Sequence, residues 1–143
     1  MTQPHRLYSL LDVLGGLRLG HTVFKTGGHG DGWIEKGALF SIPKHLRALV
    51  RAQVRGVLRA FPQAQMVVSA VLATLVRQEL GVRLAFTNRD AKGNYGFHRM
   101  YQPPPGSLVV PVEDLIFSGR DVRNQAGFFA ASGLRLLGVG AWG

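Results

Sequence analysis

One segment, residues 107–121, constrains the fold of this chain more than any other. It opens with an apolar run that is typical of a strand buried on both faces of a parallel sheet. Two adjacent acids, Glu113 and Asp114, follow, and Ser118-Gly119 then opens a predicted helix. In a doubly wound α/β sheet, this order places two carboxylates beside a helix N-terminus at the carboxyl edge of the sheet. Such an edge suits a sugar phosphate, because carboxylates bind ribose hydroxyls and free backbone N–H groups bind phosphate.

The segment resembles the ribose-phosphate signature of the type I phosphoribosyltransferases, in which a strand and two acids precede a Thr-Gly-Gly-Thr loop or a variant. The resemblance implies that Glu113 and Asp114 are catalytic: they hold the ribose hydroxyls and stabilise positive charge at the anomeric carbon. It implies a 5′-phosphate loop made of Ser118, Gly119, Arg120 and Asp121. Arg120 replaces a glycine and Asp121 a hydroxyl residue, and an aspartate repels phosphate unless Arg120 or a metal offsets its charge. The alternative is a doubly wound protein that uses the acids for another purpose, as receiver-type domains do.

A second resemblance covers residues 86–96, which are similar to the catalytic loop of orotate phosphoribosyltransferases, Phe-x-Arg-Lys-x-x-Lys-x-His-Gly. Arg89 and Lys92 take the places of the two lysines, so they are expected to neutralise the departing pyrophosphate, with Lys92 as the catalytic cation. The family closes this loop as a flap, often over the neighbouring subunit's site, which implies a homodimer. The long connection at 88–106 indicates a mobile lid. An ordinary basic surface loop is the alternative.

Residues 25–40 are similar to the N-terminal segment of orotate phosphoribosyltransferase-like proteins, in which Ser-Gly-x-His-Ser-Asp precedes an aromatic and Asn-Lys-Asp-Ala-Leu-Tyr. The resemblance implies that Lys25, Thr26 and Gly27 help to form a hood over the base. His29 is a weak candidate for a metal ligand, because no Cys, His or Asp stands near it at ligand spacing.

One element of the family pattern is missing. Active relatives hold pyrophosphate on a Gly-Pro-x-x-Gly-Gly type loop after the first core strand. Here the apolar run at 66–68 is followed by Ser-Ala-Val-Leu-Ala-Thr, so the glycines that would let backbone amides close on the anion are absent. The sequence also ends near a strand predicted at 135–139, where most relatives continue for another strand or more.

Composition sets the broad class. The chain has 143 residues, a formal net charge of +9 and no cysteine. We expect a single cytoplasmic domain, with a hood and N-terminal elements at 1–40 and a core at 41–143, and neither a secretion signal nor a membrane span. Apolar runs at 66–68, 82–86 and 108–112 predict strands, and amphipathic stretches predict helices at 5–18, 71–80 and 120–132.

A further helix is predicted to begin near Ser41, with Pro43 in its first turn. Along it, one face repeats arginine every four residues, at Arg47, Arg51, Arg55 and Arg59. The opposite stripe should face the core and consists of Leu46, Leu49, Val50, Val54, Val57, Leu58 and Phe61. Like charges four residues apart repel, so the row does not stabilise the helix. A solvated face, an anionic partner and a subunit contact all remain open.

These features predict an α/β fold of the type I phosphoribosyltransferase kind: a mainly parallel sheet with helices on both faces, a small N-terminal hood and a long flexible lid. The resemblance implies transfer of ribose 5-phosphate from phosphoribosyl pyrophosphate to a nucleobase such as orotate. It implies that Mg²⁺ is held through the phosphoribosyl pyrophosphate rather than directly by the protein, with Asp114 as the one candidate contact. The main alternative is a non-catalytic protein that binds a nucleotide or sugar phosphate. An RNA-binding module ranks last, because interleaved aromatics and nucleic-acid motifs are lacking.

Overall fold

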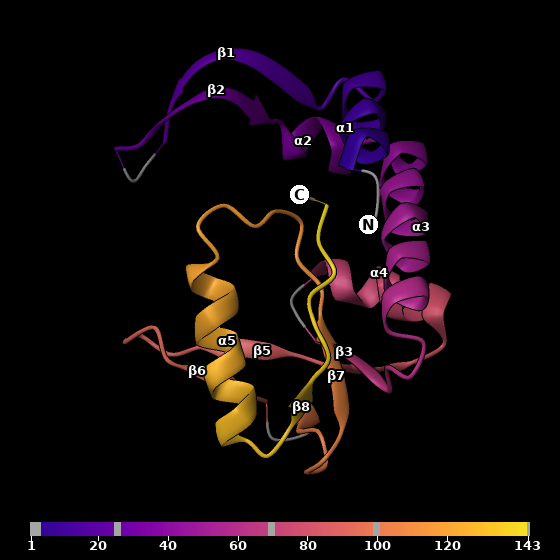
Figure 1. Cartoon of the computed structure of the whole chain (residues 1–143), viewed down its shortest axis with the longest axis vertical. Coiled ribbons are helices and arrows are strands. Elements are labelled where there is room, and N and C mark those ends of the chain that lie inside the picture. Colours follow the sequence, from indigo (N-terminus) through magenta and orange to yellow (C-terminus); the bar gives the residue numbers. More distant parts are fainter. Residues whose placement is uncertain (1–3, 25–26, 69–70, 99–100, 143) are drawn as a thin grey trace. The chain divides into compact units, whose positions relative to one another are not determined.

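The computed structural model describes residues 4–24, 27–68, 71–98 and 101–142, which form two compact units, Met1–Leu49 and Val50–Gly143 (Figure 1). None of the helices in these described ranges is long and apolar enough to cross a membrane.

The N-terminal unit is built on an antiparallel hairpin. Its elements are α1 (Pro4–Val13), β1 (Leu17–Val23), β2 (His29–Ile34), α2 (Lys36–Phe40) and the start of α3 (Pro43–Ala60). Leu11 and Leu39 are fully buried in this unit. Gly16 lies so close to Leu39 that an added Cβ would stand 2.5 Å from its side chain.

The prediction that the first helix runs to residue 18 was wrong. The helix ends at Val13, and Gly15 follows in the left-handed region with φ 70°. The Gly16 N–H donates to the Leu11 carbonyl, which closes the helix and turns the chain into β1. The glycine-rich stretch after it was predicted to be a hairpin or an ordered loop, and the hairpin is confirmed.

A parallel sheet forms the second unit. Its strands are β3 (Met66–Val68), β4 (Arg83–Ala85), β7 (Leu108–Pro111) and β8 (Arg135–Leu136), in the order β4-β3-β7-β8. Every neighbouring pair in this order is parallel. The predicted parallel sheet, with the strand before the acid pair at its centre, is therefore confirmed.

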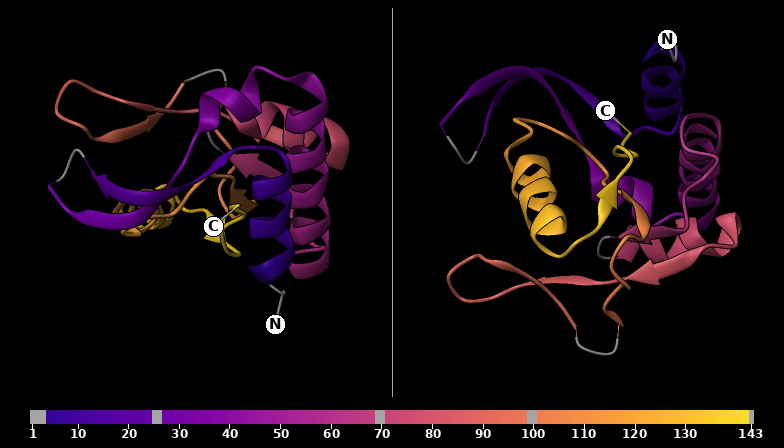
Figure 2. Two further views of the ribbon diagram at one scale, coloured as in Figure 1. Left: turned by 90° about the horizontal axis from the view of Figure 1, so that it is seen from above. Right: turned by 60° about the horizontal axis from the view of Figure 1, so that its bottom comes forward.

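Helices cover both faces of this sheet. The two further helices are α4 (Val71–Leu80) and α5 (Arg120–Ala131), and α5 lies on the face opposite α4 and α3 (Figures 1 and 2). Phe129 of α5 packs into a buried cluster with Met66, Val68, Ala85, Val109 and Leu134. Val67 and Val110, which alternate with these strand residues, are also fully buried, so both faces of the sheet are covered.

The expected lid is a second hairpin rather than a structureless loop. Strands β5 (Thr87–Arg89) and β6 (Tyr95–Phe97) pair antiparallel. At the turn, the Asp90 carboxylate accepts hydrogen bonds from the Lys92 N–H, the Asn94 N–H and the Asn94 side-chain amide, at 2.8, 2.8 and 2.9 Å. These bonds, chiefly that from the Asn94 side chain, lower the pKa of Asp90.

Aromatic rings join this hairpin to α5. The ring of Tyr95 stacks on Phe128 with a centroid distance of 6.1 Å, and the ring of Phe97 lies 4.8 Å from Phe128 and 6.1 Å from Phe129. Contacts of this kind add stabilisation beyond the burial of area. The base of the hairpin is thereby fixed beside the helix that opens the predicted phosphate site.

Replacing Phe129 by alanine should destabilise the chain by about 3–5 kcal/mol, because a fully buried ring leaves a cavity beneath α5. Urea unfolding followed by circular dichroism measures this change. Phe117→Ala is the matched control, since Phe117 is 73% exposed, and it should cost less than about 1 kcal/mol. Equal losses for the two variants would contradict the assigned core.

Candidate functional site

The acid pair lies where the sequence predicted it, at the carboxyl end of β7. The Val112 N–H donates to the Val68 carbonyl at 2.9 Å, and the Glu113 N–H donates to the Gly140 carbonyl at 2.8 Å. The Asp114 carbonyl in turn accepts from the Trp142 N–H at 3.0 Å. The backbone of both acids is therefore held at the carboxyl edge of the sheet by the C-terminal segment.

A buried glutamine on α3 completes this anchorage. The side-chain amide nitrogen of Gln53 donates to two carbonyls, of Glu113 and of Gly140, each at 2.9 Å. Gln53 is only 5% exposed and lies between the buried residues Val50 and Val54. Sequence reasoning missed it, although a polar residue within an apolar helical stripe was the available signal.

The two acids face different surroundings. The Glu113 carboxylate is half-buried and accepts a hydrogen bond of 2.6 Å from the side chain of Gln125 on α5. Burial raises the pKa of Glu113, and the bond from Gln125 opposes this shift. The Asp114 carboxylate instead accepts from the Leu115 N–H at 2.7 Å. Glu113 is thus partly engaged by the helix.

The predicted phosphate loop forms the N-terminus of α5. Gly119 is the N-cap residue, in the left-handed region with φ 68°, which favours glycine. The hydroxyl of Ser118 accepts from the Arg120 N–H at 3.3 Å. The Arg123 guanidinium lies 3.1 Å from the position that a Cβ on Gly119 would occupy. The turn therefore combines backbone N–H groups at a helix N-terminus with nearby cations, an arrangement that binds phosphate.

The charge of Asp121 is offset by Arg89 of the β5–β6 hairpin rather than by Arg120. The Arg89 guanidinium forms an ion pair with the Asp121 carboxylate at 2.8 Å, donates to the Tyr95 hydroxyl and lies 4.6 Å from the Tyr95 ring centre. Both members of the ion pair are exposed, 48% and 61%, so the pair adds little to stability. Two residues that depart from the family pattern are thus partners of each other.

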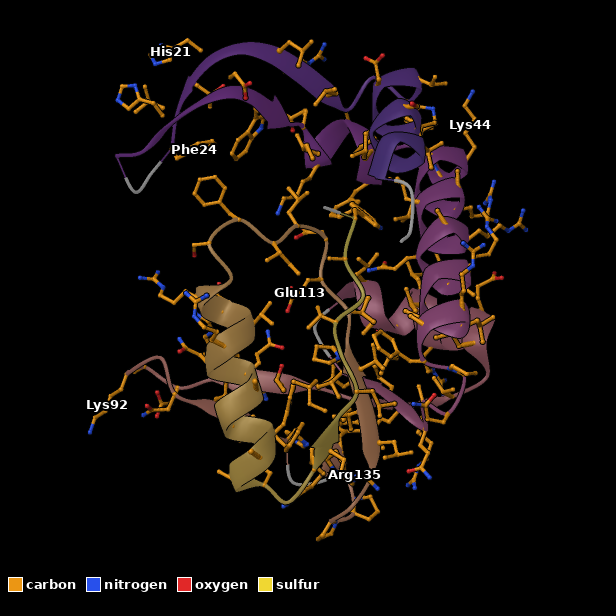
Figure 3. All side chains as sticks on the ribbon, viewed as in Figure 1. His21, Phe24, Lys44, Lys92, Glu113 and Arg135 are labelled. Atoms are coloured by element: carbon orange, nitrogen blue, oxygen red, sulfur yellow. The ribbon has the colours of Figure 1, made fainter. Side chains whose placement is uncertain are left out.

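Two of the remaining predicted residues belong to other elements. Lys92 lies at the tip of the β5–β6 hairpin and points away from Glu113 (Figure 3). Gly27 belongs to the N-terminal unit, where it is exposed in a turn and has φ 79°. Lys25 and Thr26 lie outside the described residues.

The connection that should hold pyrophosphate is short. Strand β3 ends at Val68 and helix α4 begins at Val71, so two residues, 69 and 70, join them. These two lie outside the described residues. A six-residue glycine-rich loop of the family kind has no counterpart between these bounds.

Metal ligands are sparse. Within the described ranges, no three His, Cys, Asp or Glu side chains are grouped so as to hold a metal ion. His29 does have a neighbour that the sequence did not suggest, because its Nδ1 lies 2.8 Å from the Nε2 of His21. Two imidazoles alone do not form a metal site. The Asp114 carboxylate suits Mg²⁺ that arrives with a diphosphate, since Mg²⁺ commonly binds one or two carboxylates and the phosphates of a substrate.

Several known proteins with similar sequences are orotate phosphoribosyltransferases. An orotate phosphoribosyltransferase from Methylobacterium sp. (strain 4-46) is 31% identical over 126 residues, which cover 84% of this chain and 64% of that protein. The orotate phosphoribosyltransferase from Thermus thermophilus is 28% identical over 132 residues, covering 89% of this chain and 71% of the relative. No protein-family model matches the chain.

Solved structures agree on the fold. The crystal structure of orotate phosphoribosyltransferase from Aeropyrum pernix superposes with a TM-score of 0.75 at 17% identity, covering 91% of this chain and 76% of that chain. The chain is therefore similar in sequence to orotate phosphoribosyltransferases and has the type I phosphoribosyltransferase fold. It spans just under two thirds, 64%, of the length of the Methylobacterium relative.

The Glu113→Gln substitution should give a pH-dependent gain in thermal stability. Burial raises the pKa of Glu113 in the folded state. The protonated Glu113 therefore contributes to the free energy of unfolding below the unfolded-state pKa, and this contribution is lost as the pH rises through the folded-state pKa. A neutral glutamine avoids this loss, so the melting temperature of the variant relative to the parent should increase between about pH 4 and pH 7. Glu79→Gln, at an exposed carboxylate on α4, is the control and should show no such increase.

The Asp121→Thr substitution should strengthen binding of ribose 5-phosphate. It removes an anion from the phosphate turn and releases Arg89. A unit charge about 4 Å from another is worth ~1 kcal/mol in water, so about a fivefold gain in affinity is expected by calorimetry. Asp12→Thr, an equal charge change on an exposed residue of α1, should leave the affinity unchanged. The assignment fails if the two variants behave alike.

Proposed function

We propose that this chain binds phosphoribosyl pyrophosphate at the carboxyl edge of β7 and transfers ribose 5-phosphate to a nucleobase, with orotate as the first candidate. The observation that carries the proposal is the pair Glu113 and Asp114, held at the end of a central parallel strand beside the N-terminus of α5. The sequence similarity to orotate phosphoribosyltransferases supports the same substrate class.

The chemistry requires positioning and charge rather than a protein nucleophile. The bond from the anomeric carbon to the pyrophosphate oxygen breaks, and a bond to the base nitrogen forms. Positive charge develops on the ribose, where the Asp114 carboxylate stabilises it and binds the ribose hydroxyls. Glu113 assists from its place against Gln125, and the Ser118–Asp121 turn holds the 5′-phosphate. Asp114 would hold Mg²⁺ that arrives with the substrate, and that ion would supply positive charge to the pyrophosphate.

The proposal includes a homodimer. Lys92 points away from the acids of its own chain, so we assign it to pyrophosphate in the site of a second copy. We assign Arg89 to the ligand's phosphate groups as well, once its ion pair with Asp121 opens. Gly27, with Lys25 and Thr26, keeps the base-binding role that the resemblance implies. We further propose a single functional domain, with a hood at 1–40 and a core at 41–143, and a location in the cytoplasm.

A second function is favoured by one observation. The connection of two residues between β3 and α4 leaves no glycine-rich loop for pyrophosphate. A protein that binds a nucleotide or ribose 5-phosphate without turnover needs only the acids and the phosphate turn. This candidate differs from the first in one measurable property, the release of pyrophosphate.

Pyrophosphate release from phosphoribosyl pyrophosphate, measured with orotate, uracil and adenine, should be fastest with orotate. Asp114→Asn should lower the rate about 10²–10³-fold, the usual loss when one electrostatic contact to a transition state is removed. Asp12→Asn is the control and should retain the parent rate. Mixing Lys92→Ala with Asp114→Asn protein should restore part of the activity, because one site of a mixed dimer has both residues.

Binding measurements distinguish the two candidates. If calorimetry shows that phosphoribosyl pyrophosphate binds and no base supports turnover, the chain is a binding protein. If neither phosphoribosyl pyrophosphate nor ribose 5-phosphate binds, both functions are excluded. Sedimentation that shows only a 15.6 kDa species would exclude the dimer.

A further inference from the structure

One surface is not used by the proposed function: the arginine row, formed by Arg47, Arg51, Arg55 and Arg59 along the continuous helix α3. All four side chains are exposed. With a helical rise of 1.5 Å per residue, they stand about 6 Å apart along the axis and extend over about 18 Å. The residue after each arginine is small: Ala48, Ala52, Gly56 and Ala60. A Cβ on Gly56 would meet nothing within 4 Å, so this strip is open to a close approach.

Among the residues that the structure describes, the row has no anionic partner. Residues 36–78 contain seven Lys and Arg residues and no Asp or Glu. In the ranges that the structure describes, the ion pair present joins Arg89 to Asp121, and none of the four arginines takes part in an ion pair. Arginines at four-residue spacing repel one another, which opposes helix formation. A bound anion would relieve this repulsion.

Helix α3 cannot rotate about its axis to bury the arginine row. Its opposite face is buried through Val50, Val54 and Val57, and Gln53 is tied to two backbone carbonyls of the sheet unit. The same burial excludes insertion into a bilayer, because the apolar face of α3 is already occupied. Leu58 was predicted to face the core, but it is 50% exposed beside the row, and one leucine does not make an apolar patch.

We propose that the arginine row binds the phosphate backbone of a nucleic acid, independently of the proposed transferase activity. Evenly spaced guanidinium groups, on a row that winds by about 40° per arginine around the helix, can follow a chain of evenly spaced phosphates. Each guanidinium can bind a phosphate through two parallel hydrogen bonds. The helix contains no Phe, Tyr or Trp on which bases could stack. The absence of aromatic residues argues against recognition of bases, and for the same reason an RNA-binding module was the least favoured prediction. It does not affect contacts with the phosphate backbone.

Fluorescence anisotropy with a labelled 20-nucleotide RNA and a 20-base-pair DNA duplex tests this surface. Four phosphate contacts predict a slope of log K against log salt of about −2.8 with single strands and about −3.6 with duplexes, since each contact contributes about 0.7 or 0.9, respectively. Affinity should therefore fall about 50- to 150-fold between 50 and 200 mM salt. A slope near zero would overturn the proposal.

Matched variants separate the row from the overall charge. R51Q/R55Q and R18Q/R135Q each remove two exposed arginines and lower the net charge equally, from +9 to +7. The row variant should bind at least tenfold more weakly, with the slope reduced by about 1.5, whereas the control should change less than twofold. Thermal melting checks that both variants are folded. R51K/R55K should keep the slope and lose a few-fold in affinity, because lysine lacks the second hydrogen bond.

Two outcomes would overturn the proposal. Equal weakening of R51Q/R55Q and R18Q/R135Q would mean that only the net charge matters. Vesicles containing phosphatidylserine that bind the parent protein as tightly as RNA, with the same loss in R51Q/R55Q, would assign the row to a membrane surface.

Discussion

The described site depends on the hydrogen bonds that gather at the carboxyl end of β7. Glu113 and Gly140 are joined through the backbone, and Gln53 donates to the carbonyls of both. Burying an amide costs free energy, which the two bonds of the Gln53 nitrogen offset in part, while its oxygen is buried without a hydrogen-bond partner among the described residues. The result is a fixed pair of carboxylates at a strand end, which is the property that a ribose-binding site requires.

Charge compensation links the lid hairpin to the phosphate turn. Asp121 alone is unsuited to a phosphate site, and Arg89 alone is an ordinary surface cation. Their ion pair is exposed and therefore weak, so a phosphate dianion can compete for Arg89 at little cost. The aromatic contacts of Tyr95 and Phe97 with α5 keep the hairpin near the turn whether or not that pair is formed. The departures from the family pattern are thus compatible with a ligand that replaces Asp121.

The sequence predicted the central elements because their signals were local. Strand β3 and helix α4 match their predicted bounds, since an apolar run and an amphipathic period define them without tertiary contacts. The end of α1 was missed because a left-handed Gly15, and not a change in periodicity, stops the helix. The partners Arg89 and Asp121 stand 32 positions apart, and no pattern along the chain reports which surface charges will meet.

The difference between Glu113 and Asp114 shows how a sequence motif can conceal a division of roles. In the sequence motif the two acids cannot be distinguished, and the family pattern assigns both to the ribose. In the structure it is Glu113 whose carboxylate is half-buried and accepts a hydrogen bond from Gln125 of α5, whereas the Asp114 carboxylate accepts from the Leu115 N–H. The hydrogen bond fixes the position of the Glu113 carboxylate, while burial removes part of its hydration. We therefore attribute the direct contact with the ribose mainly to Asp114 and regard Glu113 as the acid that fixes the strand end against the helix carrying the phosphate turn.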